Sequence, residues 1–488
     1  MKWIRTIDAA TAEGPETLGA KAHGLVALHR LGLPVPAGFV VVAEACREYL
    51  RDGRFPDGLR EELAAGVAAL EQATGRRFGG ARRPLAVAVR SGSAVSMPGM
   101  MDTILDLGLT SQAEAGLAAE TGNGAFAASA RRRLLDGFAA FGASAPDDAA
   151  LQLEAAVAAV FDSWNAPRAR TYRDLNAVPH DLGTAVIVQA MVFGDRDDRS
   201  GTGIAFSRDP NTGAPEPYGD VLFGHQGEDA VSGRTRTLPL DALADREPAV
   251  WDRLADALHR IEARLRDACY VEFTFESGEL WLLQTRPGRF TGAAAVRAAV
   301  DLADEGRITR SEALLRVSPG HLTHARTPRI ADDRNAIARG IGACPGVATG
   351  RIATTVEAAT RMAADGPVIL VRPETSPHDM SGLAVAAGVV TERGGPASHA
   401  AVVARAMNRP AVVGATGLVA AEGDLVTIDG TSGAVVRGRA PVAAGAADDR
   451  LRRLLDWADD ASGRRARPDG TPRGEAERLR AAHDALRR

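Results

Sequence analysis

The sequence predicts an α+β protein with more than one domain. A chain of 488 residues, 45% of them hydrophobic and 25% charged, can bury several cores and should form two to four domains. Ala-rich sequence between about 110 and 180 is typical of helices, whereas short β-rich segments with glycine turns run from Gly340 to about Arg439. Polar, proline-containing sequence from Ser318 to Asp333 lies between these regions and indicates a linker.

Charge and cysteine content exclude several classes of function. A formal net charge of -4 gives no overall attraction to nucleic acid or to an anionic membrane, so neither is expected as a partner. No apolar run approaches the roughly 20 residues of a membrane span, and no basic-apolar signal sequence opens the chain. Cys46, Cys269 and Cys344 lack metal-site or disulfide spacing, which favours a reducing cytoplasm.

Lysine is rare in this chain. Of the 58 basic residues, Lys2 and Lys21 are the two lysines and all the others are arginines. A lysine ammonium is a compact charge on a flexible stem, and it can follow a phosphate in a way that the planar guanidinium cannot. Lys21 leads into an amphipathic helix that ends before Gly32, and we treat it as a candidate phosphate ligand, with chance as the alternative explanation.

Two further segments carry residues suited to phosphate. The β-branched run from Val87 delivers Arg90 to a Ser-Gly turn, and its guanidinium has the fork geometry for bidentate phosphate contact; alone, a strand-end arginine is more often a surface charge. Residues 184–213 predict strand, loop and strand. The small-residue hairpin in the middle, with the Ser200 and Thr202 hydroxyls, could fold over a triphosphate, although most such hairpins are only turns.

A hairpin from Val271 to Arg286 offers oxygen ligands for magnesium. Alternation along its strands puts Glu272 and Thr274 on one face of the first strand, and Gln284 and Arg286 on one face of the second. Magnesium prefers hard oxygen ligands of this kind. The alternative is a purely structural hairpin with an incidental glutamate.

One histidine, His399, occupies a position that favours phosphorylation of its ring. His399 follows a Gly394-Gly395-Pro396 turn and opens a short apolar helix. A helix N-terminus offers unpaired N–H groups and partial positive charge, which favour an anion and disfavour a protonated ring. A capping or core histidine is the alternative for such a residue in isolation.

The segment from Gly394 to Arg405 resembles the phosphohistidine segment of the phosphoenolpyruvate-utilising enzymes, and within them the pyruvate phosphate dikinases. The family pattern reads Gly-Gly-Met-Thr-Ser-His-Ala-Ala-Val-Val-Ala-Arg; here Pro396 replaces the methionine and Ala397 the threonine. The block from Val87 to Leu109, with its Ser-Met-Pro-Gly-Met-Met loop, is also similar to the dikinases. Tyr270 departs from them, since it stands where they usually carry an aspartate.

The resemblance implies a fold and a set of site residues. It implies an ATP-grasp-type nucleotide-binding domain over 1–330 with a helical insertion at about 110–180, a swivelling β/β/α phosphohistidine domain over 335–440, and a charged, partly helical stub over 441–488. It implies that His399, Arg90 and Arg286 take part in phosphoryl transfer, and that Glu272 and Gln284 hold Mg2+. The nucleotide-binding residues that it implies are Lys21, Arg90, Gln189, Ser200, Gly201, Thr202, Gly203, Glu272, Gln284 and Arg286.

The activity implied is phosphorylation of His399 by Mg-ATP with inorganic phosphate, giving AMP and diphosphate. The phosphoryl group would pass to pyruvate or another acceptor at a site not in this chain, because a barrel of roughly 250 residues does not fit after residue 441. Three alternatives stay open: a separate barrel protein as partner, a different small-molecule acceptor of the pyruvate-water-dikinase or antibiotic-phosphorylating type, or a non-catalytic ATP-binding subunit.

Overall fold

The computed structural model describes residues 2–487, apart from 96, 98–99, 228–234, 236, 289, 291, 377–378, 397, 420, 444, 446–448 and 464–473. The chain forms two compact units. Unit 1 comprises Met1–Ser200 with Glu272–Arg286, and unit 2 comprises Gly201–Val271 with Pro287–Arg488. Helices and sheets occur in both units, so the predicted α+β, multidomain class is confirmed.

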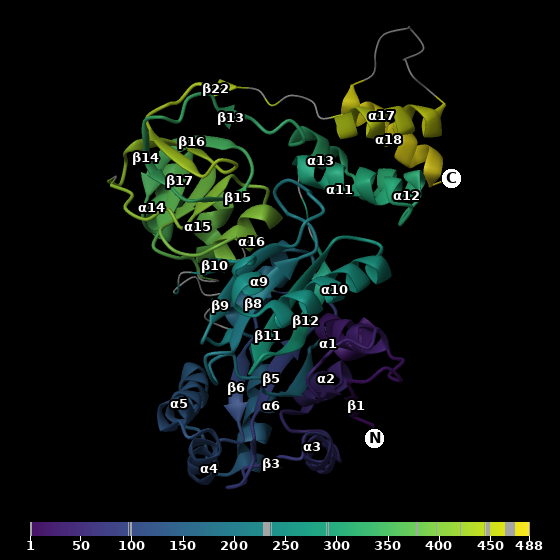
Figure 1. Ribbon diagram of the computed structural model, residues 1–488, viewed down its shortest axis with the longest axis vertical. Coiled ribbons are helices and arrows are strands. Elements are labelled where there is room, and N and C mark those ends of the chain that lie inside the picture. The colour runs from purple at the N-terminus through teal and green to yellow at the C-terminus, as the bar shows by residue number, and fades with distance from the viewer. Residues whose placement is uncertain are drawn as a thin grey trace. The chain divides into compact units, whose positions relative to one another are not determined.

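Unit 1 is built on an antiparallel five-stranded sheet (Figure 1). In spatial order its strands are β1 (Ile4–Thr6), β2 (Gly38–Val41), β7 (Ala185–Ala190), β5 (Val87–Gly92) and β6 (Thr103–Leu107). The central strands β5 and β7 are buried along almost their whole length. That burial accounts for the continuous apolar run at Val186–Val188, where a half-buried strand would alternate.

Helices of unit 1 surround this sheet. They are α1 (Pro15–Arg30), α2 (Ala43–Asp52), α3 (Leu59–Thr74), α4 (Ser111–Thr121), α5 (Gly124–Ala140), α6 (Ala149–Ser163) and α7 (Pro167–Leu175); a short β3–β4 pair (Arg77–Phe78 with Pro84–Leu85) accompanies them. Side-chain oxygens of Thr110, Asn123 and Asp148 cap α4, α5 and α6. Helix α6 packs on β5, β6 and β7.

The part of unit 1 that follows residue 271 is a β-hairpin. Strand β11 (Cys269–Glu276) enters it from unit 2, and β12 (Glu279–Pro287) returns. The turn between them has Ser277 and Gly278 at positive φ. The Leu282 N–H donates to Pro34 O over 2.8 Å, which joins the returning strand to the segment before β2.

The described residues of the first part of unit 2 include antiparallel strands followed by helices. Strands β8 (Gly201–Phe206), β9 (Tyr218–Phe223) and β10 (Leu238–Pro239) pair in sequence, and α9 (Ala242–Arg246) and α10 (Pro248–Leu265) follow. Glu262 on α10 binds the buried Arg208 guanidinium through two hydrogen bonds of 2.8 and 3.0 Å. This ion pair fastens the end of β8 to α10.

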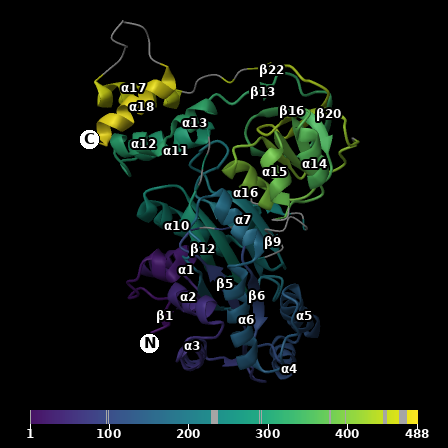
Figure 2. The same cartoon turned by 180° about the vertical axis from the view of Figure 1, so that it is seen from behind.

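An eight-stranded sheet follows in unit 2 (Figure 1). Its strands, in spatial order, are β14 (Ala336–Arg339), β21 (Ala434–Arg437), β20 (Leu425–Asp429), β16 (Val347–Ala353), β17 (Val368–Arg372), β18 (Gly388–Thr391), β19 (Ala411–Val413) and β15 (Ile341–Cys344). Strands β16 to β19 run parallel. Parallel neighbours need crossovers, and α14 (Val356–Ala363), α15 (Met380–Val385) and α16 (His399–Ala406) lie in them, packed on one face (Figure 2). The loops after β17 and β18 therefore open at the same edge.

The helices that precede this sheet in the sequence and those that follow it pack together in one hydrophobic core. They are α11 (Gly292–Asp304), α12 (Arg310–Arg316), α13 (Pro319–Thr323), α17 (Asp449–Ser462) and α18 (Glu475–Leu486). The chain enters the sheet through β13 (Arg329–Ile330) and leaves it through β22 (Val442–Ala443), and these two strands pair antiparallel. Among the described helices, none combines the length and apolarity that a bilayer crossing requires.

Candidate functional site

Lys21 is positioned by a kink in α1 that packs on the end of β5. Gly19 has φ +77°, a left-handed conformation, and a Cβ built there would lie 1.7 Å from Gly92 O. The Ala20 N–H donates to Ser93 O over 2.9 Å. Only glycine permits both this φ and this approach without strain, so the kink fixes where the helix starts and where Lys21 points.

A second glycine sets the other side of the same helix. A Cβ built on Gly24 would lie 3.0 Å from Thr285 O, so α1 runs close to the backbone of β12. Lys21 lies between these two contacts in the sequence, and Thr285 directly precedes Arg286. The helix therefore brings Lys21 to the strands that carry Arg90 and Arg286.

Arg90 joins β5 to the hairpin. Its Nη1 donates to Leu283 O over 3.1 Å, and its Nη2 donates to Glu272 Oε2 over 3.3 Å. The Arg90 and Glu272 side chains are 16% and 24% exposed, so the pair is shielded but still accessible to a small ligand. Unit 1 thus brings together Lys21, Arg90, Glu272 and Arg286, which come from α1, β5, β11 and β12.

The electrostatics of this cluster favour an anion. Burial, followed by the positive charge of Arg90, lowers the pKa of Lys21 to about 8; Glu272 opposes the shift and Arg286 adds to it. Three cationic side chains therefore face one carboxylate. An excess of positive charge that depresses a lysine pKa is relieved when a phosphate binds, so the cluster is a candidate phosphate site.

Glu272 and Gln284 fit a magnesium site that the nucleotide completes. Both have side-chain oxygens, and Gln284 is 7% exposed. Among the described residues no group of three or more His, Cys, Asp and Glu could hold a metal by itself. Magnesium commonly binds through one or two protein oxygens plus substrate phosphates, and this donor set matches that use.

Gln189 is buried on β7 beside the cluster. It lies opposite Ala88 of β5, and residues opposite each other share a face, as do Ala88 and Arg90. Gln189 Nε2 donates to Pro36 O over 3.0 Å. This predicted nucleotide-binding residue therefore shares the Arg90 face of the sheet, and its amide is already bonded to the segment before β2.

The predicted hairpin over the triphosphate takes a different form. Ser200 is fully buried; its hydroxyl donates to Asp197 Oδ1 over 2.6 Å and accepts from the Ser277 N–H over 3.0 Å. The hydroxyl closes the turn between β11 and β12 and points to no phosphate. In unit 2, Gly201, Thr202 and Gly203 are buried residues of β8, paired with β9.

The loop before Ser200 is also tied down. Arg196 bonds Glu276 Oε1 over 2.9 Å and Glu120 Oε1 over 3.0 Å, and the Phe193 N–H donates to Glu276 Oε2 over 2.9 Å. The sequence predicted an exposed small-residue turn because glycine and serine are typical of turns. In this structure ion pairs anchor residues 193–200 and strand pairing holds residues 201–203, and the nucleotide-binding role of Ser200 to Gly203 stays a prediction.

Tyr270 lies in an apolar cluster of unit 2. It is 3% exposed and makes a T-shaped contact with Phe206, with ring centroids 5.2 Å apart. A tyrosine in this environment supplies no carboxylate. The predicted departure from the dikinases is thus a change from an acidic position to a packing position.

His399 is the first residue of α16, as predicted. Ser398 is the N-cap; its N–H donates to Gly395 O and its carbonyl accepts from the Val402 N–H, both over 3.0 Å. Burial lowers the pKa of His399, an effect that Asp379 partly opposes. The ring is therefore neutral at pH 7, as expected, with burial as the main cause. Ala397, the other predicted departure, lies outside the described residues.

Thr375, which the sequence reasoning missed, faces the histidine. Its Oγ1 lies 3.3 Å from His399 Nδ1, and its side chain is buried at 4% exposure. The Ser398 Oγ is also buried and has no hydrogen-bond partner among the described residues. Thr375 follows β17 and His399 follows β18, so the parallel pairing of these strands was the signal that could have found it.

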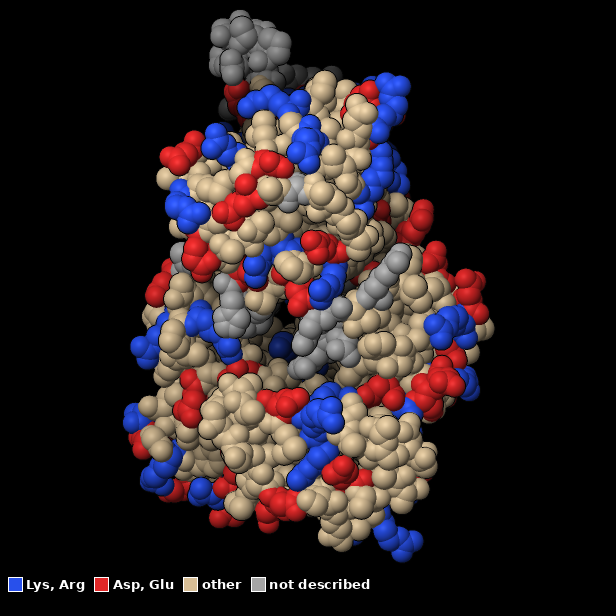
Figure 3. Space-filling view, turned by 90° about the vertical axis from the view of Figure 1, so that its left-hand side faces the viewer, with Lys and Arg blue, Asp and Glu red and all other residues tan. Residues whose placement is uncertain are grey.

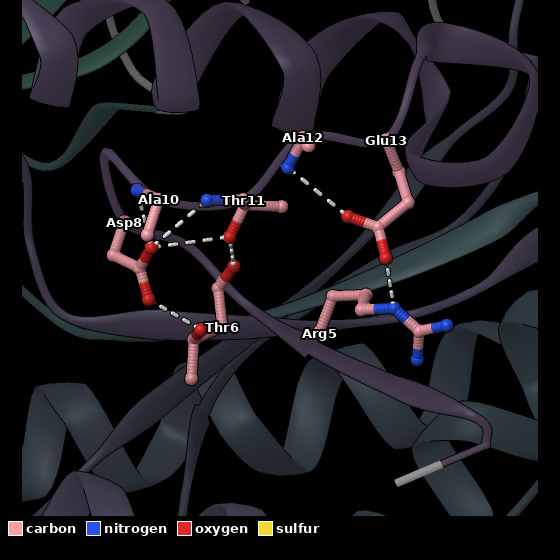
Figure 4. A pocket seen from close by; sticks show the side chains of 7 residues that line it. All are labelled: Arg5, Thr6, Asp8, Ala10, Thr11, Ala12 and Glu13. Carbon is pink, nitrogen blue, oxygen red and sulfur yellow. Dashed lines mark hydrogen bonds and ion pairs between the residues drawn. The ribbon is translucent and has the colours of Figure 1, made fainter.

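A pocket elsewhere in unit 1 does not match this chemistry. It measures about 500 Å3 and is lined by Arg5, Thr6, Asp8, Ala10, Thr11, Ala12 and Glu13 (Figure 4). Its polar groups bind one another: Asp8 Oδ1 accepts from the Ala10 and Thr11 N–H groups, and Glu13 pairs with Arg5. A hydrogen bond from Thr6 lowers the pKa of Asp8, so this carboxylate stays charged and repels phosphate.

The face of the protein in Figure 3 shows no large patch of one charge that would indicate another binding site. Acidic and basic side chains are interspersed there, in line with the small net charge. The three cysteines are buried, and they form no disulfide with any described residue.

Two protein families match this chain, one over a nucleotide-binding region and one over the segment that contains His399. Residues 50–239 match the family described as pyruvate phosphate dikinase, AMP/ATP-binding domain, and residues 364–433, which contain His399, match the family described as PEP-utilising enzyme, mobile domain. The chain belongs to the pyruvate phosphate dikinase family.

Relatives along almost the whole chain bear the same name. It is 38% identical to pyruvate, phosphate dikinase of Rhizobium meliloti (strain 1021), over 94% of this chain and 60% of the relative. It is 39% identical to pyruvate, phosphate dikinase 2 of Zea mays and to the enzyme of Giardia intestinalis, in both cases over 91% of this chain and 58% of the relative. The chain thus spans about three fifths of the length of these dikinase relatives.

Proposed function

We propose that this chain is a dikinase-type phosphotransferase that uses Mg-ATP and inorganic phosphate to phosphorylate His399. AMP and diphosphate are the products of this half-reaction. Phospho-His399 then passes its phosphoryl group to pyruvate, to which the names of the relatives point, or to another small-molecule acceptor. The acceptor binds outside the residues assigned here, on a separate barrel protein or elsewhere. A cytoplasmic location, in keeping with cysteines that form no disulfide among the described residues, belongs to the same proposal.

The observation that carries the proposal is the grouping of Lys21, Arg90 and Arg286 around Glu272. These side chains come from α1, β5 and the hairpin, and burial, followed by the positive charge of Arg90, lowers the pKa of Lys21. A cluster of this kind costs free energy in the empty protein. It is useful if phosphates bind there, because phosphoryl transfer depends mainly on positioning and charge neutralisation.

The histidine supplies the nucleophile. If Nδ1–H donates to Thr375 Oγ1, the lone pair of Nε2 is free. Nε2 attacks the β-phosphorus, and the bond from that phosphorus to the AMP oxygen breaks, so AMP leaves with the electron pair. An oxygen of inorganic phosphate then attacks the γ-phosphorus; the β–γ bridge breaks, diphosphate leaves, and one phosphoryl group stays on His399.

The residues of unit 1 have distinct tasks in this scheme. Arg90 and Arg286 bind and orient the reacting phosphates, and Lys21 neutralises charge that develops on them. Glu272 and Gln284 are the residues that would hold Mg2+, which on binding screens the charge of the phosphate oxygens. Gln189 lies on the adenine side of the nucleotide.

A second candidate is a non-catalytic ATP-binding subunit, which the Tyr270 position favours. A buried tyrosine replaces the aspartate expected there, so one acidic group is missing beside Glu272. Such a protein would bind ATP without transferring its phosphates.

One labelling experiment separates these candidates. The purified chain is incubated with Mg-ATP labelled at the β-phosphate, and acid-labile, base-stable label on the protein is counted for wild type and His399→Asn. Label on wild type alone, with AMP released and more AMP when phosphate is added, supports the proposal. ATP binding without label supports the second candidate, and equal label on His399→Asn refutes the assignment of the histidine. Adding pyruvate and measuring phosphoenolpyruvate then tests the acceptor.

A further inference from the structure

Arg405 is an arginine that the proposed chemistry does not use. It lies on α16, six residues after His399, and it is 4% exposed. Arginine is almost never buried without partners, because removing its charge from water is costly. Burial lowers the pKa of Arg405, which shows how strongly this position disfavours the charge. A small apolar residue would fit the pattern of the helix at less cost.

The partners of Arg405 are main-chain carbonyls. Nη2 donates to Pro396 O over 2.8 Å, and Nη1 donates to Ala343 O in β15 over 2.9 Å. Pro396 belongs to the turn that precedes His399, so the guanidinium ties this turn both to the end of its own helix and to the edge strand of the sheet. The guanidinium also lies over the Phe206 ring, 5.5 Å from its centre, which completes its burial.

The turn before His399 lacks a side-chain cap. The Ser398 N–H donates to Gly395 O, but the Ser398 side chain makes no capping bond with the described residues, so the bond from Arg405 to Pro396 O adds a second anchor. A planar guanidinium with two donors in fixed geometry can set the orientation of the Pro396 carbonyl, whereas an ammonium cannot hold both carbonyls in one plane. A nucleophile that is misplaced by about 1 Å loses on the order of 100-fold in rate.

We infer that Arg405 is a positioning residue for phosphorylation of His399. It binds the Pro396 carbonyl before His399 and the Ala343 carbonyl of β15, and so fixes the imidazole against Thr375. The inference rests on the proposed function, which it deepens by adding a residue that acts on the nucleophile without touching a phosphate. Its effect falls on the phosphoryl-transfer step and leaves the nucleotide cluster in unit 1 unchanged.

The test compares Arg405→Met, Arg405→Lys and the control Arg361→Met in the full chain. Arg361 lies on α14 of the same sheet, is 68% exposed and is 3.7 Å from Glu422. Three quantities are measured: the rate of His399 labelling from β-labelled ATP, the Kd for Mg-ATP, and the pKa of His399 by NMR of imidazole-labelled protein. Thermal melting shows which variants are folded.

We expect Arg405→Met to label at least tenfold more slowly with an unchanged Kd, and Arg405→Lys to lie between it and wild type. The His399 pKa should rise toward its ordinary value in Arg405→Met, because a loosened turn exposes the ring, and should move less in Arg405→Lys. Arg361→Met should match wild type in all three measurements.

A purely structural role predicts a different result. Melting would fall while labelling per folded molecule and the His399 pKa stayed at the wild-type values, and this outcome overturns the inference. If Arg405→Met does not fold, Arg405→Lys decides: a wild-type rate and pKa in that variant also overturn it. If wild type itself takes no label, the proposed function fails, and the His399 pKa still tests whether Arg405 positions the ring.

Discussion

Arg90 Nη2 and Glu272 Oε2 lie 3.3 Å apart, although 182 residues separate them in the sequence. The pair joins a central strand of the sheet to the hairpin that returns to unit 1 after residue 271. Because both side chains remain partly accessible, the contact is open to a ligand that binds Arg90 on one side and shares a cation with Glu272 on the other.

Replacing Glu272 with glutamine should therefore affect nucleotide and metal together. The variant loses a magnesium ligand and the charge that supports protonation of Lys21, so its AMP formation should fall at least 100-fold at saturating ATP. Steady-state AMP release at several Mg2+ concentrations measures this. Glu279→Gln, at the exposed start of β12, is the matched control, and an equal loss there would contradict the assignment.

Lys21 should make ATP binding depend on pH. Its pKa in the folded protein is about 8, so the ammonium is lost as pH rises through 8, and the affinity for ATP should fall above that value. Above pH 8 the unfolded chain binds the additional proton, so the stability of the ATP-free protein should increase from pH 8 to about 10.5. Calorimetric titration and denaturant melts between pH 6.5 and 10 measure both effects; in Lys21→Met both should vanish.

His399 should stay active below pH 7. Burial lowers its pKa, so labelling from β-labelled ATP should fall less between pH 7.5 and 6.5 than it would for an exposed histidine, which is half protonated at pH 6.5. Thr375→Val removes the hydroxyl that faces Nδ1 and should slow labelling about tenfold, the equivalent of ~1.4 kcal/mol. A Thr375→Ser variant keeps the hydroxyl and should restore most of the rate; failure to do so would refute the role of the hydrogen bond.

The kink at Gly19 should be indispensable. Gly19→Ala forces a Cβ to within 1.7 Å of Gly92 O and strains a left-handed φ, which alone costs about 1–2 kcal/mol. The variant should melt earlier and bind ATP weakly, because Lys21 moves with the helix. Gly124→Ala at the start of α5 meets nothing within 4 Å and should be neutral or slightly stabilising. Equal melting temperatures for the two variants would contradict this account of the kink.

The buried ion pair of unit 2 should matter more for stability than any surface pair. Arg208→Met removes the two-bond partner of the buried Glu262 and leaves it the Ser207 hydroxyl and the Arg307 guanidinium at 4.0 Å, so the free energy of unfolding should fall by about 3 kcal/mol. Arg453→Met removes an exposed pair with Asp304 and should cost about 1 kcal/mol or less. Urea unfolding curves give both values, and similar losses would show that burial of the Arg208 pair is unimportant.

Much of the site in unit 1 could be predicted from the sequence. Lys21, Arg90, Glu272 and Arg286 stand in segments whose local pattern is regular, a helix start and three strands, so their chemistry could be judged one segment at a time. His399 was equally clear, since a glycine turn before a short apolar helix fixes its place. The sequence could not show that these groups would meet, because that depends on two glycine contacts, Gly19 with Gly92 and Gly24 with Thr285.

The features that the sequence did not show have a common physical cause, since they depend on contacts between residues far apart in the sequence. Ser200 to Gly203 look like a turn by composition, but Arg196 and Glu276 form ion pairs across 80 residues, and no local pattern reports such long-range bonds. For a similar reason Thr375 was missed, and Arg405 was matched to the family pattern without a role. Thr375 depends on two parallel strands ending side by side, and Arg405 is buried on a helix whose other residues are mostly apolar. Glu228 and Asp229, which belong to an element that resembles the Gln-Gly-Glu-Asp of the dikinases, lie outside the described residues, and so do Pro98 and Gly99 of the Met-Pro-Gly loop.

The pairing of β13 with β22 limits how the His399-bearing sheet can turn. The chain enters through Ile330 and leaves through Val442, and these two residues are partners in a two-stranded ribbon. The Ile330 N–H also donates to Asp429 Oδ2 of β20, and this hydrogen bond joins the ribbon to the sheet. Any rotation of this sheet must therefore twist both strands of the β13–β22 ribbon at once. The torsional stiffness of the paired strands limits such a rotation more than the flexibility of either strand alone.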